Sequence, residues 1–286
     1  MKKISRESFE FNMISSKTKI LGIFGYPIKH SLSPLMHNTV LKKMCLDFVY
    51  LPFEVKPDDL LGAVDAIRIL KIAGINVTIP HKENIIKYLD KISDEAKKIG
   101  AVNTVINKNG NLYGHNTDYY GFLKSISKKN SLINKNILML GCGGVAKAIA
   151  VALVNSKINQ LTVCDIDEKK AEVFLDNKFP QIKIIKTLQI SDEIKKVDIF
   201  INATNVGMKK GDSSPIDKKY LRKDLFVYDV VYNTETQLLK DAKKTGAKFS
   251  DGLDMLVYQG AKSFELWTGK TPPVELMKKV LVGVLS

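Results

Sequence analysis

Short apolar runs alternate with amphipathic helical stretches along almost the whole chain. Runs that read as buried strands lie at residues 20–24, 48–53, 74–77, 137–140, 160–164, 182–185, 199–203 and 226–229. Helical patterns lie between them, for example at residues 34–44, 82–88, 145–155 and 169–178. The alternation of strand and helix predicts an α/β protein with parallel sheets.

The length and composition of the chain fit two globular domains. With 286 residues, of which 45% are apolar, the chain is too long for most single cores. The best internal boundary lies near residues 116–120, and the last helices can pack back on the first domain. We therefore expect one domain made of residues 1–118 and 252–286, and a second domain made of residues 119–251.

Targeting and cysteine features favour a cytoplasmic protein without a membrane span. No apolar run approaches the roughly 18 residues that a membrane helix needs. Residues 1–16 lack the apolar core of a signal peptide, and we expect them to form an extension before the first strand. The three cysteines are scattered and form no CxxC pair, which argues against a disulfide framework or a metal site.

The formal net charge of +14 comes mainly from lysines that are spread along the whole chain. This distribution is typical of solvated helix faces, and a basic surface can also steer anionic ligands. The sequence has no zinc finger, concentrated basic helix or RNA-stacking motif. We expect small-molecule ligands rather than nucleic acid or a membrane, and both a monomer and a homodimer stay open.

Residues 137–147, ILMLGCGGVAK, have the features of a dinucleotide-binding turn. An apolar strand runs into Gly141, Gly143 and Gly144, and an apolar helix follows. The first glycine permits a tight turn, and the next two let backbone N–H groups approach a pyrophosphate at the helix start. The spacing departs from a strict GxGxxG, and an ordinary turn is the alternative. The flanking strand and helix favour a Rossmann cofactor domain with a doubly wound parallel sheet.

Asp165 ends the next strand, 21 residues after Gly144. An acidic side chain at this point accepts hydrogen bonds from the adenosine ribose hydroxyls and repels a 2′-phosphate. The spacing therefore favours NAD over NADP. A helix N-cap without a role in cofactor binding is the alternative.

Four segments of the N-terminal half carry small polar groups near the ends of predicted strands, where ligands of open α/β sheets bind. They are HSLSPLMHN at 30–38, NVTIPHK at 76–82, GAVNT at 100–104 and GHNTD at 114–118. In the first segment, Ser31 and Ser33 come before Pro34, which can open a helix whose free N–H groups suit a carboxylate.

The other three segments add an ammonium group, amides and a carboxylate. Lys82 follows a strand end, where partial desolvation fits an acid–base group. Asn103, Asn116 and Asp118 carry groups that read hydroxyls well. Taken singly, N-capping, a solvated surface lysine and turn chemistry explain the same residues.

In this order, the segments resemble the shikimate dehydrogenase family. The resemblance extends from about residue 20 to residue 277, and it includes INATNVG at 201–207, DVVYNTETQLL at 229–239 and GLDMLVYQGA at 252–261. It implies an N-terminal α/β substrate domain and a Rossmann cofactor domain. It also implies reversible NAD(P)H-dependent reduction of 3-dehydroshikimate to shikimate, a step of aromatic amino-acid and chorismate biosynthesis.

The family pattern also implies roles for individual residues. Lys82 would be the acid–base residue, and Asp118 would hold both Lys82 and the substrate. The substrate carboxylate would be bound by Ser31, Ser33 and Tyr232. The substrate hydroxyls would be read by Asn76, Thr78, Asn103, Asp118 and Gln259. The cofactor would be lined by Gly141, Cys142, Gly143, Gly144, Val145, Asp165, Thr204, Val230 and Gly252.

The sequence departs from the family pattern after the second Rossmann strand. NADP-using members carry Asn–Arg–Thr there, whereas this chain has Asp165–Ile166–Asp167. In lacking this arginine, the chain is similar to NAD-preferring quinate/shikimate dehydrogenases, so NAD is favoured as the cofactor. Lys169 and Lys170 could still reach a 2′-phosphate, which keeps NADP possible.

Two alternatives to a dedicated shikimate dehydrogenase stay open, and the departure favours the first of them. A quinate/shikimate dehydrogenase would use both acids, but quinate-leaning members tend to have threonine at the position of Ser33. A non-catalytic dinucleotide-binding regulatory module would retain the glycine loop and lose the substrate site. The presence of both Lys82 and Asp118 argues against that module.

Overall fold

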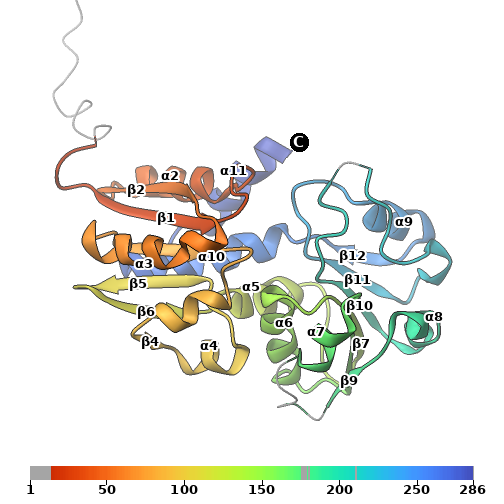
Figure 1. Cartoon of the computed structure of the whole chain (residues 1–286). Helices are drawn as coiled ribbons and strands as arrows, with labels where there is room; N and C mark the ends of the chain where they lie inside the picture. The colour runs from red at the N-terminus through yellow and green to blue at the C-terminus, as the bar shows by residue number, and fades with distance from the viewer. Residues whose placement is uncertain (1–13, 175–178, 180, 210, 286) are drawn as a thin grey trace, which may run out of the picture. The chain divides into compact units, whose positions relative to one another are not determined.

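The computed structural model describes residues 14–174, 179, 181–209 and 211–285 (Figure 1). Most of the expected N-terminal extension and residues 175–178 of one predicted helix lie outside this range. The chain divides into two compact units. The first unit comprises Met1–Lys97, Ala101–Thr117 and Gly260–Ser286, and the second comprises Lys98–Gly100 and Asp118–Gln259. The expected division into a substrate-binding and a dinucleotide-binding domain stays a prediction.

The first unit contains a six-stranded sheet in the order β2-β1-β3-β5-β6-β4. Its strands are β1 (Lys19–Gly25), β2 (Phe48–Glu54), β3 (Gly74–Val77), β4 (Lys91–Ile92), β5 (Thr104–Lys108) and β6 (Asn111–His115). Strand β1 pairs in parallel with β2 and β3, but β5 is antiparallel to both β3 and β6.

The expectation of a purely parallel sheet is therefore wrong for the first unit. Asn109 and Gly110 both have positive φ angles, 54° and 89°, between β5 and β6. An Asn-Gly pair with two positive φ angles makes a tight hairpin turn that matches the twist of antiparallel strands. The turn reverses the chain directly, so no crossover helix separates these two strands.

Two helices of the first unit, α2 (Ser33–Lys43) and α3 (Leu60–Ile69), pack against this sheet, and α11 (Val274–Leu285) packs on α2. Val64 and Ile67 of α3 are fully buried in one cluster with Ile75 of β3 and Val105 of β5. The helix predicted at 82–88 is only a 3-10 helix, η2 (Asn84–Tyr88), because the chain turns extended at Leu89 to enter β4.

The second unit contains a six-stranded sheet that is parallel throughout, in the order β12-β11-β10-β7-β8-β9. The strands are β7 (Asn136–Leu140), β8 (Gln160–Cys164), β9 (Ile182–Ile184), β10 (Ile199–Asn202), β11 (Phe226–Asp229) and β12 (Lys248–Ser250). The strand order reverses next to β7, which is the arrangement of a doubly wound Rossmann-type sheet. The predicted two-domain α/β fold class is confirmed.

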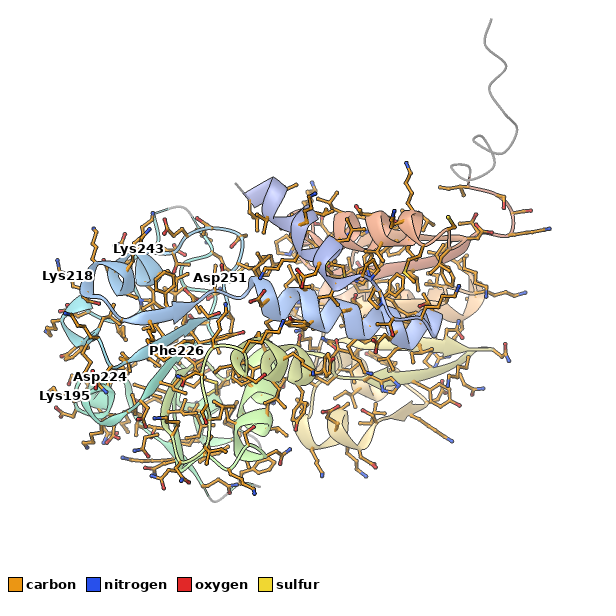
Figure 2. All side chains as sticks on the ribbon, turned by 180° about the vertical axis from the view of Figure 1, so that it is seen from behind. Lys195, Lys218, Asp224, Phe226, Lys243 and Asp251 are labelled. Carbon is orange, nitrogen blue, oxygen red and sulfur yellow. The ribbon has the colours of Figure 1, made fainter. Side chains whose placement is uncertain are left out.

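Most helices of the second unit alternate with its strands along the chain. They include α5 (Asp118–Ile126), which comes before β7, and α6 (Gly144–Val154), α7 (Glu168–Glu172), α8 (Ile190–Glu193) and α9 (Gln237–Thr245). Helix α6 is apolar enough to be buried over much of its length, as the sequence indicates. The lysines Lys195, Lys218 and Lys243 are exposed at the surface of this unit (Figure 2). None of the helices in the described ranges is long and apolar enough to cross a membrane.

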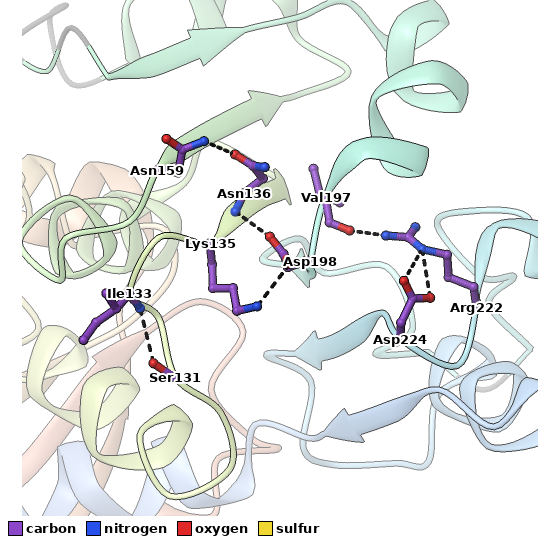
Figure 3. A network of polar contacts seen from close by, with 9 residues as sticks. All are labelled: Ser131, Ile133, Lys135, Asn136, Asn159, Val197, Asp198, Arg222 and Asp224. Atoms are coloured by element: carbon purple, nitrogen blue, oxygen red, sulfur yellow. Dashed lines mark hydrogen bonds and ion pairs between the residues drawn. The ribbon is translucent and has the colours of Figure 1, made fainter.

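A polar network joins the amino ends of β7, β10 and β11 (Figure 3). Asp198 accepts hydrogen bonds from the Asn136 backbone N–H at 2.8 Å and from Lys135 Nζ at 3.1 Å. Arg222 donates to the carbonyl oxygens of Ile194 and Val197. These contacts fasten the edge of the sheet that lies opposite to its glycine loop.

Candidate functional site

The carboxyl edge of the first sheet gathers most of the polar residues that the sequence predicts there. Asn76 and Thr78 lie at the end of β3, and Asn116 follows the end of β6. The sequence predicts Asn103 after a strand, but the structure places it directly before β5. Because β5 runs antiparallel to β3, its beginning lies at the end of β3, and the Val77 N–H donates to the Asn103 carbonyl at 2.8 Å.

The side chain of Asn76 is buried, and partners within the first unit occupy both of its polar atoms. Its Nδ2 donates to the Asn103 carbonyl at 3.1 Å, and it also reaches Thr104 Oγ1 at 3.2 Å and Ser263 Oγ at 3.1 Å. Its Oδ1 accepts a hydrogen bond from Tyr50 Oη at 2.7 Å. An amide oxygen has two lone pairs, so Asn76 Oδ1 can accept a second hydrogen bond, from a substrate hydroxyl, beside the one from Tyr50.

The hydroxyl network around Asn103 contains three residues that the sequence reasoning did not single out. Asn103 Nδ2 donates to Thr117 Oγ1 at 3.0 Å, and Asn103 Oδ1 accepts from the Thr117 N–H at 2.7 Å. Ser263 Oγ lies 2.8 Å from Thr104 Oγ1 and 3.1 Å from Thr117 Oγ1. Ser263 comes four residues after Gln259 in helix α10 (Leu253–Thr268). That spacing places both side chains on one helix face, and it could have identified Ser263 as a candidate.

The two serines of the first segment lie where α2 begins. Ser33 is buried in the first turn, and its N–H donates to Ser31 Oγ at 3.3 Å. Leu32 occupies the N-cap position, so no side chain caps the helix there. Helix starts have backbone N–H groups without partners in the helix, and these suit an anion such as a carboxylate.

Lys82 is not a solvated surface lysine, because only 8% of it is exposed. Its carbonyl accepts a hydrogen bond from the Val102 N–H at 2.8 Å. The neighbouring His81 is also buried, and its Nε2 lies 2.7 Å from the Val55 carbonyl oxygen. These contacts hold the segment after β3 against two other parts of the first unit. Asp118, the partner implied for Lys82, is 5% exposed and begins α5 in the second unit.

The glycine loop of the second unit lies at the carboxyl end of β7. Gly141 has a φ of +105°, and a Cβ there would lie 2.8 Å from the Ala203 carbonyl oxygen. Only glycine fits that position. Gly143 is the N-cap of α6, and a Cβ built on it would meet no atom within 4 Å. The loop therefore leaves open space at the helix start, where a pyrophosphate could approach the backbone.

Asp165 contacts the glycine loop directly. Its Oδ2 accepts a hydrogen bond from the Cys142 N–H at 2.8 Å, and its Oδ1 accepts from the Asp167 N–H at 3.0 Å. The N-cap of α7 is Asp167, which accepts from the Lys170 N–H, so the N-cap alternative for Asp165 is wrong. Burial, together with the charge of Asp165, raises the pKa of Cys142 to about 12, which keeps the thiol neutral.

Two buried residues that the sequence reasoning missed shape the ends of β10 and β11. Asn202 Oδ1 accepts hydrogen bonds from the N–H of Thr204 at 3.2 Å and from its hydroxyl at 2.6 Å. Asp229 accepts from Asn202 Nδ2 at 2.9 Å and from the Val231 N–H at 3.1 Å. Both residues lie in segments that resemble the family, INATNVG at 201–207 and DVVYNTETQLL at 229–239, and these segments could have identified them.

Other predicted residues of the second unit lie beside this pair. The Val230 N–H donates to the Asn202 carbonyl at 3.0 Å. A Cβ on Gly252 would lie 2.0 Å from the Val230 carbonyl oxygen, so these two backbones touch. Thr204, Val230 and Gly252 are thus brought together at one edge of the sheet. Tyr232 follows two residues after Val230, and burial raises the pKa of its phenol.

Comparisons with known proteins match almost the whole chain. The family models are the shikimate dehydrogenase substrate binding domain at residues 23–105, shikimate / quinate 5-dehydrogenase at residues 124–229, and the shikimate 5'-dehydrogenase C-terminal domain at residues 252–282. A shikimate dehydrogenase (NADP(+)) of Methanococcus maripaludis strain C6 is 45% identical over 276 residues, which cover 94% of this chain and 98% of the relative.

Solved structures agree with the sequence comparison. Shikimate dehydrogenase from Aquifex aeolicus is 40% identical with a TM-score of 0.89, and the match covers 94% of this chain and 99% of that chain. Shikimate 5-dehydrogenase from Listeria monocytogenes, solved with shikimate and NAD, is 38% identical with a TM-score of 0.83 and coverages of 94% and 98%.

Proposed function

The chain belongs to the shikimate dehydrogenase family of oxidoreductases, and we propose that it catalyses the reversible NAD(P)-dependent reduction of 3-dehydroshikimate to shikimate. The observation that supports this most strongly is the burial of Lys82 beside a sheet edge rich in amides and hydroxyls. A buried lysine in such surroundings is poorly placed for solvation and well placed for acid–base chemistry.

The first unit would bind the acid. The hydroxyls of Ser31 and Ser33 at the start of α2 would hold the substrate carboxylate, helped by Tyr232. Thr78, Asn103 and Gln259 would read the ring hydroxyls. Asn76 Oδ1 would accept a hydrogen bond from a ring hydroxyl through its second lone pair.

Lys82 would supply the proton that the reacting ketone oxygen takes up. Reduction of a ketone places negative charge on its oxygen, and the Lys82 ammonium would stabilise that charge and donate a proton to the oxygen. Asp118 would hold the ammonium and the substrate in register. In the reverse direction, the neutral amine would take the proton from the hydroxyl of shikimate.

The dinucleotide fits the second unit because the glycine loop leaves open space at Gly143, next to the start of α6. When bound, the nicotinamide supplies or accepts the hydride. Gly141, Cys142, Gly143, Gly144 and Val145 would contact the pyrophosphate. Thr204, Val230 and Gly252 would line the remainder of the nucleotide.

We propose that NAD is preferred over NADP, although the Methanococcus maripaludis relative is named for NADP(+). Asp165 is held beside the loop by the Cys142 N–H, and its carboxylate would bind the ribose hydroxyls and repel a 2′-phosphate. The Listeria relative was solved with NAD, which shows that a protein of this family can bind that nucleotide.

Steady-state kinetics with shikimate and quinate, each with NAD and NADP, test the proposal. We expect kcat/KM to be highest for shikimate with NAD. A tenfold preference for NADP would overturn the assignment of NAD, and faster oxidation of quinate would favour the quinate/shikimate alternative. In Asp165→Asn, the kcat/KM values for NAD and NADP should lie closer together than in the wild type. The preferred acid should not change.

A further inference from the structure

Asp229 is a fully buried carboxylate at the carboxyl end of β11 in the second unit. Among the residues that the structure describes, no lysine, arginine or histidine forms an ion pair with it. Burial raises the pKa of its carboxyl group, and hydrogen bonds from Thr236, the Val231 N–H and Asn202 act against this rise. A buried charge without a counter-charge is costly, so a cation bound close to Asp229 would be stabilised.

The partners of Asp229 all donate hydrogen bonds to it. Asn202 Nδ2 and the Val231 N–H donate to Oδ1 at 2.9 and 3.1 Å, and the Thr236 hydroxyl donates to Oδ2 at 2.7 Å. The orientation of the Asn202 amide is fixed, because its Oδ1 accepts a hydrogen bond from the Thr204 N–H. Two donors on Oδ1 and one on Oδ2 suit an ionised carboxylate, which only accepts. The three bonds therefore hold the charge in place without cancelling it.

The strand order of the second sheet shows which side of the glycine loop a nicotinamide ring would occupy. The loop follows β7, and Asp165, which we propose for the adenosine ribose, follows β8. Strands β10 and β11 lie on the other side of β7 from β8. A pyrophosphate on the loop, with its adenosine toward β8, therefore directs the nicotinamide half toward the ends of β10 and β11. Neighbouring strands are about 4.8 Å apart, so the end of β11 lies about 10 Å along the edge from that of β7.

Two of the proposed cofactor contacts adjoin Asp229 at this edge. Val230 is its neighbour in the chain, and Thr204 is bonded to Asn202, which is bonded to Asp229. The oxidised nicotinamide ring carries one positive charge, whereas the reduced ring is neutral because it has gained a hydride. We propose that the carboxylate of Asp229 makes the second unit bind a positively charged nicotinamide ring more tightly than a neutral one. This inference rests on the proposed function, because it takes a nicotinamide nucleotide as the ligand.

Asp229→Asn removes the charge and nearly keeps the shape of the side chain. The new amide can accept from Asn202 and from the Val231 N–H through its oxygen, and it can donate to the Thr236 hydroxyl through its nitrogen. We expect the Kd for NAD+ to rise about three- to tenfold, the range for a unit charge acting through partly screened protein. The Kd for NADH should change much less. Isothermal titration calorimetry measures both constants.

Asp198→Asn is the matched control, because it removes one negative charge from the opposite edge of the same sheet, where Asp198 pairs with Lys135 at 3.1 Å. The Kd for each nucleotide should stay at the wild-type value. Thermal unfolding shows whether Asp229→Asn is folded, and the proteins are titrated below the lowest Tm.

A second measurement needs no variant. A dinucleotide with benzamide in place of nicotinamide has a flat ring like that of NAD+, but the ring is neutral. The wild type should bind NAD+ more tightly than this analogue, and Asp229→Asn should narrow the difference. If NADP proves to be the better nucleotide, the titrations of the variants use NADP+ and NADPH, and the analogue carries the same 2′-phosphate.

Each other outcome has a defined meaning. Equal affinity of the wild type for the charged dinucleotide and its benzamide analogue overturns the inference, whether or not the variant folds. A rise by the same factor for the oxidised and the reduced nucleotide in Asp229→Asn also overturns it, because Asp229 would then only hold the loops. If the wild type oxidises shikimate normally, the proposed function survives either result. A wild type that binds none of these nucleotides overturns the proposed function, and the inference falls with it.

Discussion

The carboxyl edges of the two sheets use short polar side chains in different ways. At the edge of the first sheet, Asn76 and Asn103 bind hydroxyl side chains such as Thr117 and Ser263. At the edge of the second sheet, Asp165 and Asn202 bind backbone N–H groups of the loops that follow the strands. The first edge therefore orients mainly side chains, whereas the second also fixes the course of the backbone.

This difference matches the ligands that we propose for the two units. An acid with several hydroxyls is distinguished by individual donors and acceptors, which side chains provide. A pyrophosphate is bound mainly by backbone N–H groups at a helix start, and these require a defined loop. Substitutions at the first edge should therefore change chemistry and substrate use, and substitutions at the second should change nucleotide binding.

The largest expected effect is at the first edge, where Lys82→Ala removes the proposed proton donor. We expect kcat to fall about 10²–10⁴-fold, with a smaller change in the KM for shikimate, because proton transfer contributes mainly to the transition state. Steady-state kinetics in both directions measure the loss. Lys87→Ala, which removes an exposed lysine near Tyr88, is the control and should keep wild-type turnover. Normal turnover in Lys82→Ala would remove Lys82 from the mechanism.

A pair of glycine substitutions tests the second edge, with the next largest effect. Gly141→Ala forces a side chain into a positive φ against the Ala203 carbonyl, so we expect a lower Tm and a KM for the nucleotide that is about tenfold higher or more. Thermal unfolding and nucleotide titration measure both effects. A wild-type Tm together with a wild-type KM would show that the course of the loop does not depend on Gly141.

Gly143→Ala separates an effect on nucleotide binding from an effect on stability. Gly143 has an ordinary φ of −79°, and among the described residues, apart from Gly143 and its chain neighbours, none lies within 4 Å of the added carbon. The Tm should stay at the wild-type value, while the KM for the nucleotide should rise, because only a pyrophosphate would meet the methyl group. If nucleotide binding is unchanged, the pyrophosphate does not approach the loop at this point.

The sequence predicts the second unit better than the first. In a parallel sheet each strand is followed by a helix, so local apolar runs such as 226–229 locate the strands closely. The hairpin of the first unit was missed, although Asn109 and Gly110 carry a strong turn signal. Because of that hairpin, a strand begins at Thr104, and Asn103 therefore lies before a strand and not after one.

The buried partners of the candidate site were harder to predict than its motifs. Ser263 bonds to Asn76 across 187 positions of the sequence, and Tyr50 reaches Asn76 across 26. No local pattern reports such contacts, because they depend on how strands and helices pack. Asn202 and Asp229 lie within recognisable blocks, but their role in holding loops becomes visible only from their hydrogen bonds.

The smallest expected effect is at the opposite edge of the second sheet, where Asp198 should serve stability alone. Burial raises the pKa of Asp198, but the Asn136 N–H and Lys135 together outweigh it and leave the pKa below the usual range. The carboxylate therefore stabilises the fold above about pH 4 and loses this effect as the pH falls through its lowered pKa. Asp198→Asn should lower the Tm slightly at pH 7, with a difference from wild type that shrinks below about pH 4 and kinetics that do not change. Asp192→Asn, which breaks only an exposed pair with Lys195, should hardly alter the Tm. A changed KM in Asp198→Asn would contradict the separation of a functional edge from a structural one.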